Sequence, residues 1–265
     1  MKGPQRIVCL STESCEVLYR LGEQDRIVGI SGFTVHPPQA RKEKPKVSAF
    51  TSAKTEKILA LKPDLVLGYC DLQADIAADL AREGLEVHLF NQRDIAGILR
   101  MIETLGALVH ASERAEVLVA ELQAGMDRVR QQAAQLSRRP KVYFEEWDGP
   151  LISGIRWASE LIELAGGEDC FAELSHYPKA KQRYITDPQD VVRRAPDLII
   201  GSWCGKRFRP EHLADRPGWP AIPALRDGQL FEIKSPDILQ PGISALTIGL
   251  EQLHNLIRDW DQRQC

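Results

Sequence analysis

The 265-residue sequence has no long apolar run and no large excess of charge of either sign. A membrane-crossing helix needs about 18 apolar residues in succession, and no stretch approaches that length. The 34 basic and 37 acidic residues give a net charge of −3, whereas dedicated nucleic-acid binders usually carry a strong basic excess. We therefore expect neither direct membrane insertion nor a nucleic-acid partner. The content of 43% hydrophobic and 27% charged residues is that of an ordinary globular protein.

Signatures of common enzymes and metal sites are also missing. The sequence contains no GxSxG, GxGxxG or GxxxxGK[ST] motif. Its six histidines form neither an HExxH motif nor a pair four residues apart. These absences predict a protein with no catalytic centre, no resident cofactor and no metal ion bound directly by its side chains.

The cysteines and the first residues bear on the cellular compartment. No CxxC pair is present, and the N-terminus runs directly into a short apolar segment, Ile7–Leu10, without a longer export segment or a small-residue cleavage site. We expect free thiols and a cytoplasmic location, or a periplasmic one if the N-terminus is trimmed. The cysteines are Cys9, Cys15, Cys70, Cys170, Cys204 and Cys265.

A weak internal repeat divides the chain into two similar halves. Residues 58–68 and 191–201 each read as the end of a helix, a Pro-Asp break, and an aliphatic strand stopped by glycine. Proline prevents the helix from continuing, and an unbroken aliphatic run is typical of a parallel strand covered on both faces. At about 150 residues per domain, the length also fits two small domains.

Each half alternates strands and helices, which predicts an α/β fold of two Rossmann-like lobes with parallel sheets. We place the lobes at residues 1–93 and 140–265. Between them, residues 94–139 hold a helix over 94–109 and a long helix over 112–136, which together form the connecting segment. Two lobes joined in this way predict a ligand cleft between them.

Several segments resemble the vitamin B12-binding and ferric-siderophore-binding proteins of ABC importers, the class III substrate-binding proteins with a helical backbone. The resemblance rests on Ser31–Phe33, Pro37–Ala40, Val47–Phe50 and Glu56–Ile58, and continues more weakly through Ile152–Gly154. It implies that the cleft binds a bulky cobalt or iron chelate, such as a corrinoid, a ferric siderophore or haem, without catalysis.

The same resemblance implies an ABC permease as partner, docked through one exposed glutamate at the tip of each lobe. Glu56 keeps this charge in the first lobe. In the second lobe the equivalent position is Gln189, with Asp190 beside it, so one docking charge is missing or displaced. We assign docking to Glu56 and Asp190.

Candidate ligand-binding residues follow the carboxyl ends of the predicted strands or lie in basic loops of the second lobe. Aromatic rings there offer flat faces for a large chelate, although such rings also close the ends of cores. The basic and aromatic clusters over 176–184 and 206–209 favour an anionic ligand, or are solvated loops. The candidates are Phe33, His36, Phe50, Tyr69, Trp147, Arg183, Trp203 and Lys206.

Three further expectations concern individual residues. His36 could serve as an axial ligand to iron or cobalt. The alternative function is a cytosolic enzyme or chelate-handling protein that uses the same cleft, with Glu145 or Glu146 as general acid or base and Cys204 as nucleophile. Under the binding hypothesis we expect Trp203→Ala to weaken ligand affinity without unfolding the chain.

Overall fold

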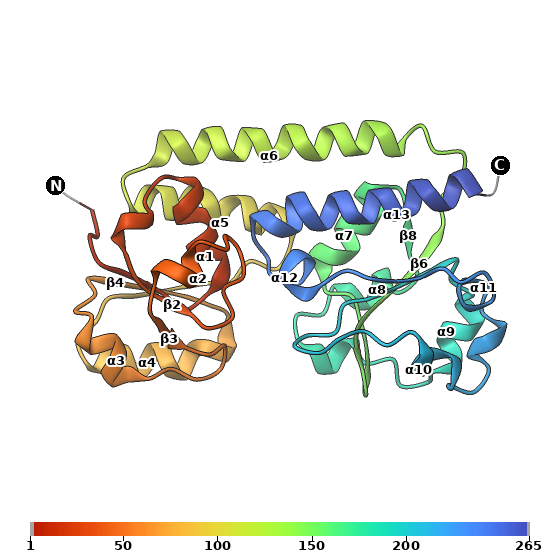
Figure 1. Cartoon of the computed structure of the whole chain (residues 1–265), viewed down its shortest axis with the longest axis horizontal. Helices are drawn as coiled ribbons and strands as arrows, with labels where there is room; N and C mark the ends of the chain where they lie inside the picture. The colour runs from red at the N-terminus through yellow and green to blue at the C-terminus, as the bar shows by residue number, and fades with distance from the viewer. Residues whose placement is uncertain (1–2, 264–265) are drawn as a thin grey trace. The chain divides into compact units, whose positions relative to one another are not determined.

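A computed structural model of the chain describes residues 3–263 and divides into two compact units (Figure 1). The first lobe comprises Met1–Leu122 and Pro241–Ile243, and the second comprises Gln123–Gln240 and Ser244–Cys265. Helix α6 (Ser112–Ala133) crosses the boundary and ends three residues before the predicted Leu136. The predicted connecting segment 94–139 is thus shared between the lobes. Within residues 3–263, none of the helices combines the length and apolarity that a bilayer crossing requires.

The first lobe is built on a parallel sheet with the strand order β3-β2-β1-β4-β5. Its strands are β1 (Ile7–Cys9), β2 (Ile27–Ser31), β3 (Lys46–Ser48), β4 (Leu65–Tyr69) and β5 (Val87–Phe90). Its helices are α1 (Thr12–Arg20), η1 (Gln24–Arg26), α2 (Ala40–Glu43), α3 (Thr55–Ala60), η2 (Asp71–Gln73), α4 (Ala74–Arg82) and α5 (Ile95–Leu108).

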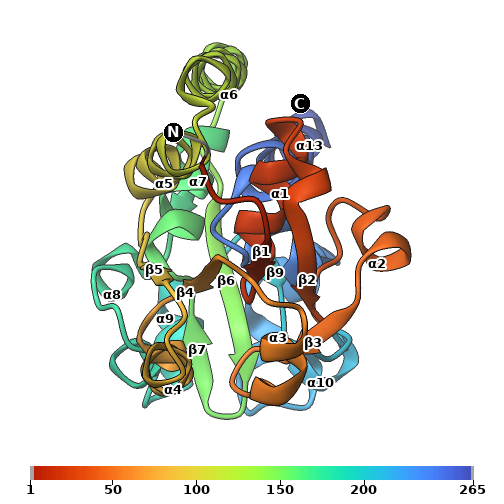
Figure 2. The same ribbon diagram turned by 90° about the vertical axis from the view of Figure 1, so that its left-hand side faces the viewer.

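Helices cover both faces of this sheet, which explains its aliphatic strands. Figure 2 faces the first lobe and shows α1 and α5 above the strands, with α3 and α4 below them. Val8 and Leu10 pack with Ile58 of α3 and Leu80 of α4 in one buried cluster. Full burial of each aliphatic side chain contributes about 1.5–3 kcal/mol to stability. The prediction of an α/β lobe here is confirmed.

The second lobe has the sheet order β10-β9-β6-β7, with β8 also paired to β6. Its strands are β6 (Lys141–Asp148), β7 (Leu151–Ser153), β8 (Glu168–Asp169), β9 (Leu198–Gly201) and β10 (Leu230–Glu232). Its helices are α7 (Arg156–Ala165), α8 (Ala172–Ser175), η3 (Ala180–Arg183), α9 (Gln189–Arg194), α10 (Glu211–Ala214), η4 (Trp219–Ala221), α11 (Pro223–Arg226), α12 (Ser235–Ile238), the π-helical segment η5 (Ala245–Gly249) and α13 (Leu250–Arg263).

One part of the second sheet differs from the sequence prediction. The sequence predicts a strand over 141–145 followed by a loop, but the strand continues through Asp148 and pairs with β7 in antiparallel register. The cause is the two-residue Gly149-Pro150 connection, because only antiparallel strands can be joined by so short a turn. The other strand pairs of this sheet are parallel.

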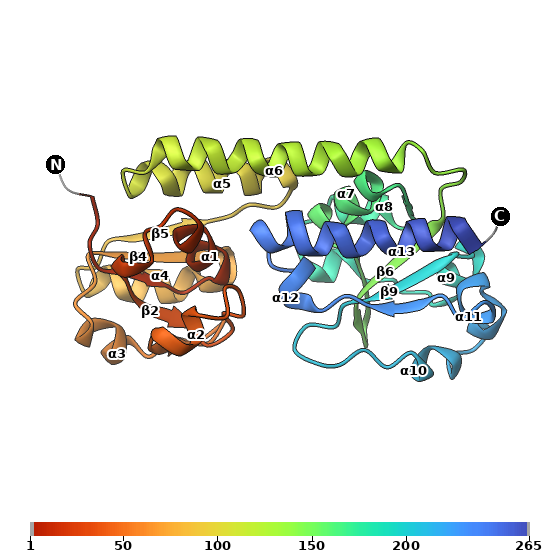
Figure 3. The same ribbon diagram turned by 45° about the horizontal axis from the view of Figure 1, so that its top comes forward.

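The two faces of the second sheet are covered by different helices. Helices α7 and α13 pack against each other on one face, while α10 lies toward the other (Figure 3). The second face buries a cluster rich in aromatic rings, including Tyr143, Phe171 and Trp219. Gly201 ends β9 beside this cluster, and a Cβ atom there would lie 1.9 Å from a ring carbon of Phe208. The strand-ending glycine thus permits a close approach by a ring.

The Pro-Asp repeat has the same physical role in both lobes. Asp64 accepts hydrogen bonds from the backbone N–H groups of Gln5 (2.7 Å) and Arg6 (2.8 Å), at the start of β1. Asp197 accepts one from the N–H of Lys141 (2.8 Å), at the start of β6. In each lobe the aspartate therefore fixes the first strand of the lobe beside the strand that follows the Pro-Asp pair. The prediction of two repeated α/β halves is confirmed.

Capping residues fix the ends of several helices. The Ser11 and Asp94 side chains accept from Ser14 N and Gly97 N at the starts of α1 and α5, as favoured at N-caps. Gly166 ends α7 in the left-handed conformation, with φ of 102°. Among the described residues, Cys9, Cys15, Cys70, Cys170 and Cys204 are free thiols, as expected, and Cys265 lies outside those residues.

Candidate functional site

In the first lobe, the candidate residues follow the carboxyl ends of adjacent strands but differ in exposure. The Phe33 side chain, after β2, is 53% exposed, while Phe50 and His36 are half-buried. Tyr69 ends β4 and is buried, with its hydroxyl donating to the Gln92 carbonyl oxygen at 3.2 Å. Tyr69 therefore supports the strand ends, and Phe33 presents an accessible ring.

Two residues of this edge were missed in the sequence. Leu72 follows β4 and is 59% exposed, which makes it a second accessible apolar side chain at this end of the sheet. Arg93 follows β5, pairs with Asp71 at 2.9 Å, and lies 5.7 Å from the centre of the Tyr69 ring. No local pattern marked Arg93, because its partners come from another strand end. A single leucine in the short helix η2 likewise gave no signal.

In the second lobe, Lys206 joins two predicted aromatic residues. Its ammonium lies 4.2 Å from the ring centre of Trp147 and 4.9 Å from that of Trp203. It also forms an ion pair with Asp148 at the end of β6. A cation over aromatic faces is held by the ring quadrupoles. The structure thus brings Trp147, Trp203 and Lys206 together, and we call them, with Asp148, the tryptophan–lysine cluster.

Trp203 is more deeply placed than expected. Only 3% of it is exposed, its ring packs edge-on to Phe208 at 5.1 Å, and its indole N–H donates to Glu145 at 3.0 Å. Truncating a buried tryptophan to alanine typically costs about 3–5 kcal/mol. We therefore expect Trp203→Ala to lower the stability of the second lobe as well as to weaken ligand binding. Trp203 nevertheless lines the pocket described below.

Glu145 is fully buried beneath this cluster and receives four hydrogen bonds. Arg216 donates to both carboxylate oxygens, at 2.6 and 3.0 Å, and the Tyr143 hydroxyl donates at 3.0 Å. The fourth hydrogen bond comes from the indole N–H of Trp203. Burial and the Glu145 carboxylate raise the pKa of Tyr143 well above its ordinary value, so its hydroxyl stays protonated and able to donate.

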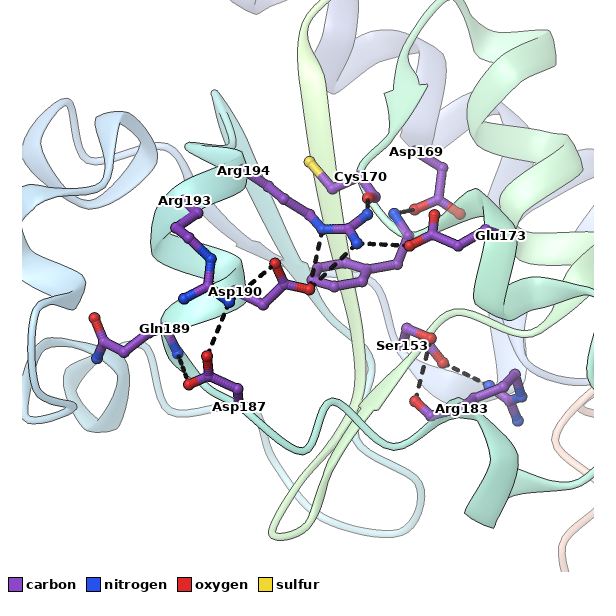
Figure 4. A network of polar contacts seen from close by, with 11 residues as sticks. Ser153, Asp169, Cys170, Glu173, Arg183, Asp187, Gln189, Asp190, Arg193 and Arg194 are labelled. Carbon is purple, nitrogen blue, oxygen red and sulfur yellow. Dashed lines mark hydrogen bonds and ion pairs between the residues drawn. The ribbon is translucent and has the colours of Figure 1, made fainter.

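Arg183 is also buried rather than available to solvent. It is 1% exposed and forms a two-pronged ion pair with Glu146, at 2.6 and 3.2 Å. It also bonds to the Ser153 carbonyl oxygen of β7 (Figure 4). Its charge is therefore balanced inside the lobe, and the expected positive loop over 176–184 is less positive than the sequence indicated.

A surface pocket of about 580 Å³ opens at the carboxyl ends of β9 and β10. It lies beside the tryptophan–lysine cluster, since Trp203 and Lys206 belong to both. Two cations that the prediction did not include, Arg207 and Lys234, also line it. The lining residues are Trp203, Gly205, Lys206, Arg207, Glu232, Lys234, Ser235 and Pro236.

The residues of the alternative enzyme hypothesis are poorly disposed for catalysis. Glu145 is saturated by four donors, and Glu146 is held by Arg183. Desolvation together with the Glu146 carboxylate raises the pKa of Cys204, so this thiol is less often in the nucleophilic thiolate form. Within residues 3–263, no three His, Cys, Asp or Glu side chains are arranged to hold a metal ion.

The two docking candidates have different surroundings. Glu56 lies exposed in the first turn of α3. Asp190 in α9 pairs instead with Arg193 and Arg194 of its own helix, at 3.4 and 3.2 Å (Figure 4). The neighbouring Gln189 donates to the Pro217 carbonyl oxygen at 2.6 Å. The charge of Asp190 is thus already compensated, while that of Glu56 faces solvent.

Comparison with known proteins adds independent information. A family model described as "Periplasmic binding protein" matches residues 7–236. A vitamin B12-binding protein of Vibrio campbellii is 27% identical, over 90% of this chain and 85% of that protein. An uncharacterised ABC transporter substrate-binding lipoprotein of Bacillus subtilis is 24% identical, over 95% and 79%. The solved periplasmic heme-binding protein from Roseiflexus sp. RS-1 has a TM-score of 0.83 at 22% identity, with coverages of 98% and 100%, and so shares the fold.

Proposed function

Since the chain belongs to the periplasmic binding protein family, we propose that it binds a bulky cobalt or iron chelate as the substrate-binding component of an uptake system. The chelate is cargo rather than a resident cofactor. The observation that carries the proposal is the pocket of about 580 Å³ beside the tryptophan–lysine cluster. Ligand sites in α/β folds lie outside the carboxyl ends of parallel strands, where this pocket opens.

The side chains at the pocket fit the recognition of a large, flat molecule. Trp147 is half-buried, so part of its ring is accessible, and its indole N–H is already satisfied by the Gly149 carbonyl oxygen at 3.0 Å. The first lobe, described by itself, exposes the side chains of Phe33 and Leu72 at its own strand ends. Rigid aromatic faces bind planar ligands at a low cost in side-chain entropy.

Relatives support the choice of ligand class and of partner. The Vibrio relative is named for vitamin B12, and the Roseiflexus protein of the same fold for heme. The Bacillus relative is named as part of an ABC transporter, which supports a permease partner for this chain as well. We assign the contact with that permease to Glu56, whose carboxylate is exposed. Binding without catalysis is favoured because Glu145 and Glu146 are fully engaged in structural pairs.

A fluorescence-quenching titration with cobalamin, cobinamide, haemin and ferric siderophores tests this function. All five tryptophans, Trp147, Trp157, Trp203, Trp219 and Trp260, belong to the second lobe, so quenching reports on that lobe. Absorption by the ligand is corrected with free tryptophan. We expect saturable quenching at micromolar concentration or below by at least one compound.

Two variants make the assay specific. Trp147→Ala should weaken binding of the responsive ligand, whereas Tyr177→Ala, which removes an exposed ring outside the pocket, should not. The absence of a saturable response to every chelate would contradict the proposed function.

A further inference from the structure

We propose that the cargo of this protein carries an anionic group, which Arg207 and Lys234 receive in the pocket at the ends of β9 and β10. This inference rests on the proposed function and narrows it to one ligand class. A neutral corrinoid and an anionic iron chelate are both bulky, but they differ in charge. The lining of the pocket distinguishes between them.

Some charged side chains around the pocket have partners within the protein, and others do not. Lys206 is engaged by Asp148, and the Glu232 carboxylate accepts a hydrogen bond from the Phe208 backbone N–H at 3.1 Å. Arg207 and Lys234 have no carboxylate within ion-pair distance among residues 3–263. Both side chains are exposed at the pocket. Glu232 keeps its negative charge, so Arg207 and Lys234 together leave the pocket with one positive charge in excess.

The surroundings strengthen an interaction with an anion. The Trp203 ring and Pro236 form apolar parts of the lining, and such walls reduce the screening by water of charges beside them. Arg207 offers a planar fork of donors that matches a carboxylate, and Lys234 offers a point charge. A carboxylate, catecholate or similar oxyanion on the rim of a chelate satisfies both cations.

The source of this charge differs from the one predicted from sequence. The clusters over 176–184 and 206–209 were expected to attract an anion, but Glu146 neutralises Arg183 and Asp148 engages Lys206. Lys234 lies outside both clusters and comes from the strand end after β10. The anionic preference thus rests on a pair of cations that are 27 positions apart, at 207 and 234.

The test uses pairs of chelates that differ in charge at constant metal. The first pair is haemin and its dimethyl ester, in which the two propionates are esterified. The second is a ferric tris-catecholate and an uncharged ferric tris-hydroxamate, with cyanocobalamin as a neutral reference. Dissociation constants are measured by titration calorimetry at low and high salt. We expect the anionic member of at least one pair to bind about tenfold or more tightly, and its affinity to fall with salt.

The variant Arg207→Gln/Lys234→Gln assigns that preference to the pocket. It should weaken the anionic ligand about tenfold and leave the neutral partner unchanged. Because both side chains are exposed, the substitutions should not affect folding. The control Lys42→Gln/Arg128→Gln removes the same charge from exposed positions outside the pocket and should have no effect.

The outcomes separate the two proposals. Equal binding of both members of each pair, or tightest binding of cyanocobalamin, refutes the anionic inference and leaves the proposed function standing. If the double variant still prefers the anionic ligand, the inference is also refuted, because residues other than Arg207 and Lys234 then recognise the negative charge of the ligand. Failure of every chelate to bind overturns the proposed function and the inference with it.

Discussion

Replacing Glu145 by alanine should strongly destabilise the second lobe. The carboxylate is fully buried and accepts from Arg216, Tyr143 and Trp203, so its removal leaves a mostly buried guanidinium and two other donors without an acceptor. Breaking a buried ion pair by removing one partner typically costs about 3–5 kcal/mol. We expect a loss of that size in the free energy of unfolding of the second lobe.

Tryptophan fluorescence during urea unfolding reports on the stability of the second lobe, because all five tryptophans lie in that lobe. Far-UV circular dichroism recorded in parallel reports on both lobes. The control is Asp127→Ala in α6, which breaks an ion pair with Arg130 whose side chains are 59% and 62% exposed. Exposed pairs contribute about 0–1 kcal/mol, so the control should unfold almost as the wild type does.

A second variant distinguishes the stability lost by leaving Arg216 unpaired from the stability lost with the packing of the Glu145 side chain. Glu145→Met combined with Arg216→Met leaves no unpaired charge and fills a similar volume, so it should recover part of the lost stability. A loss below about 1 kcal/mol in Glu145→Ala would refute the reasoning. It would mean that water or a rearranged side chain satisfies Arg216 at little cost.

Two other expectations concern pH and docking. Burial raises the pKa of Glu13 above its ordinary value of 4.5, so the first lobe should lose stability as the pH rises from 4.5 through the folded-state pKa. Glu13→Gln should remove that loss, and equal pH profiles of wild type and variant by circular dichroism melting would contradict this. In pull-downs with the reconstituted permease, Glu56→Gln should weaken capture more than Asp190→Asn, because Arg193 and Arg194 already compensate Asp190. The reverse order would show that those pairs open on docking.

Local signals explain why most of the fold was predictable. The Pro-Asp breaks act over a few neighbouring positions and lie where expected. Ser11, Asp94 and the glycine that ends α7 cap their helices through equally local contacts. The parallel strands were recognisable because burial on both faces requires aliphatic side chains throughout. The extension of β6 beyond residue 145 gave no such signal, since Glu145, Glu146 and Asp148 read as a polar loop.

The candidate site was less predictable because partner choice depends on tertiary contacts. Arg183 and Glu146 are 37 positions apart, and Lys206 and Asp148 are 58 apart, so no spacing rule could pair them. Phe33 and Trp203 both follow buried strands, yet one is 53% exposed and the other 3%. The difference comes from Phe208 and Glu145, which enclose Trp203 from distant parts of the chain.

The division of the chain has a consequence for its synthesis. The first lobe includes Pro241–Ile243, and these residues are integral to its packing. The Gln92 side chain donates to the Pro241 carbonyl oxygen at 2.9 Å, and a Cβ atom on Gly242 would lie 3.1 Å from the Cβ of Glu13. On the ribosome, the lobe that is made first therefore cannot complete its interior until residues 241–243, which follow most of the second lobe, have emerged. A fragment that stops at Leu122 would leave both Gln92 and Glu13 uncovered at that position.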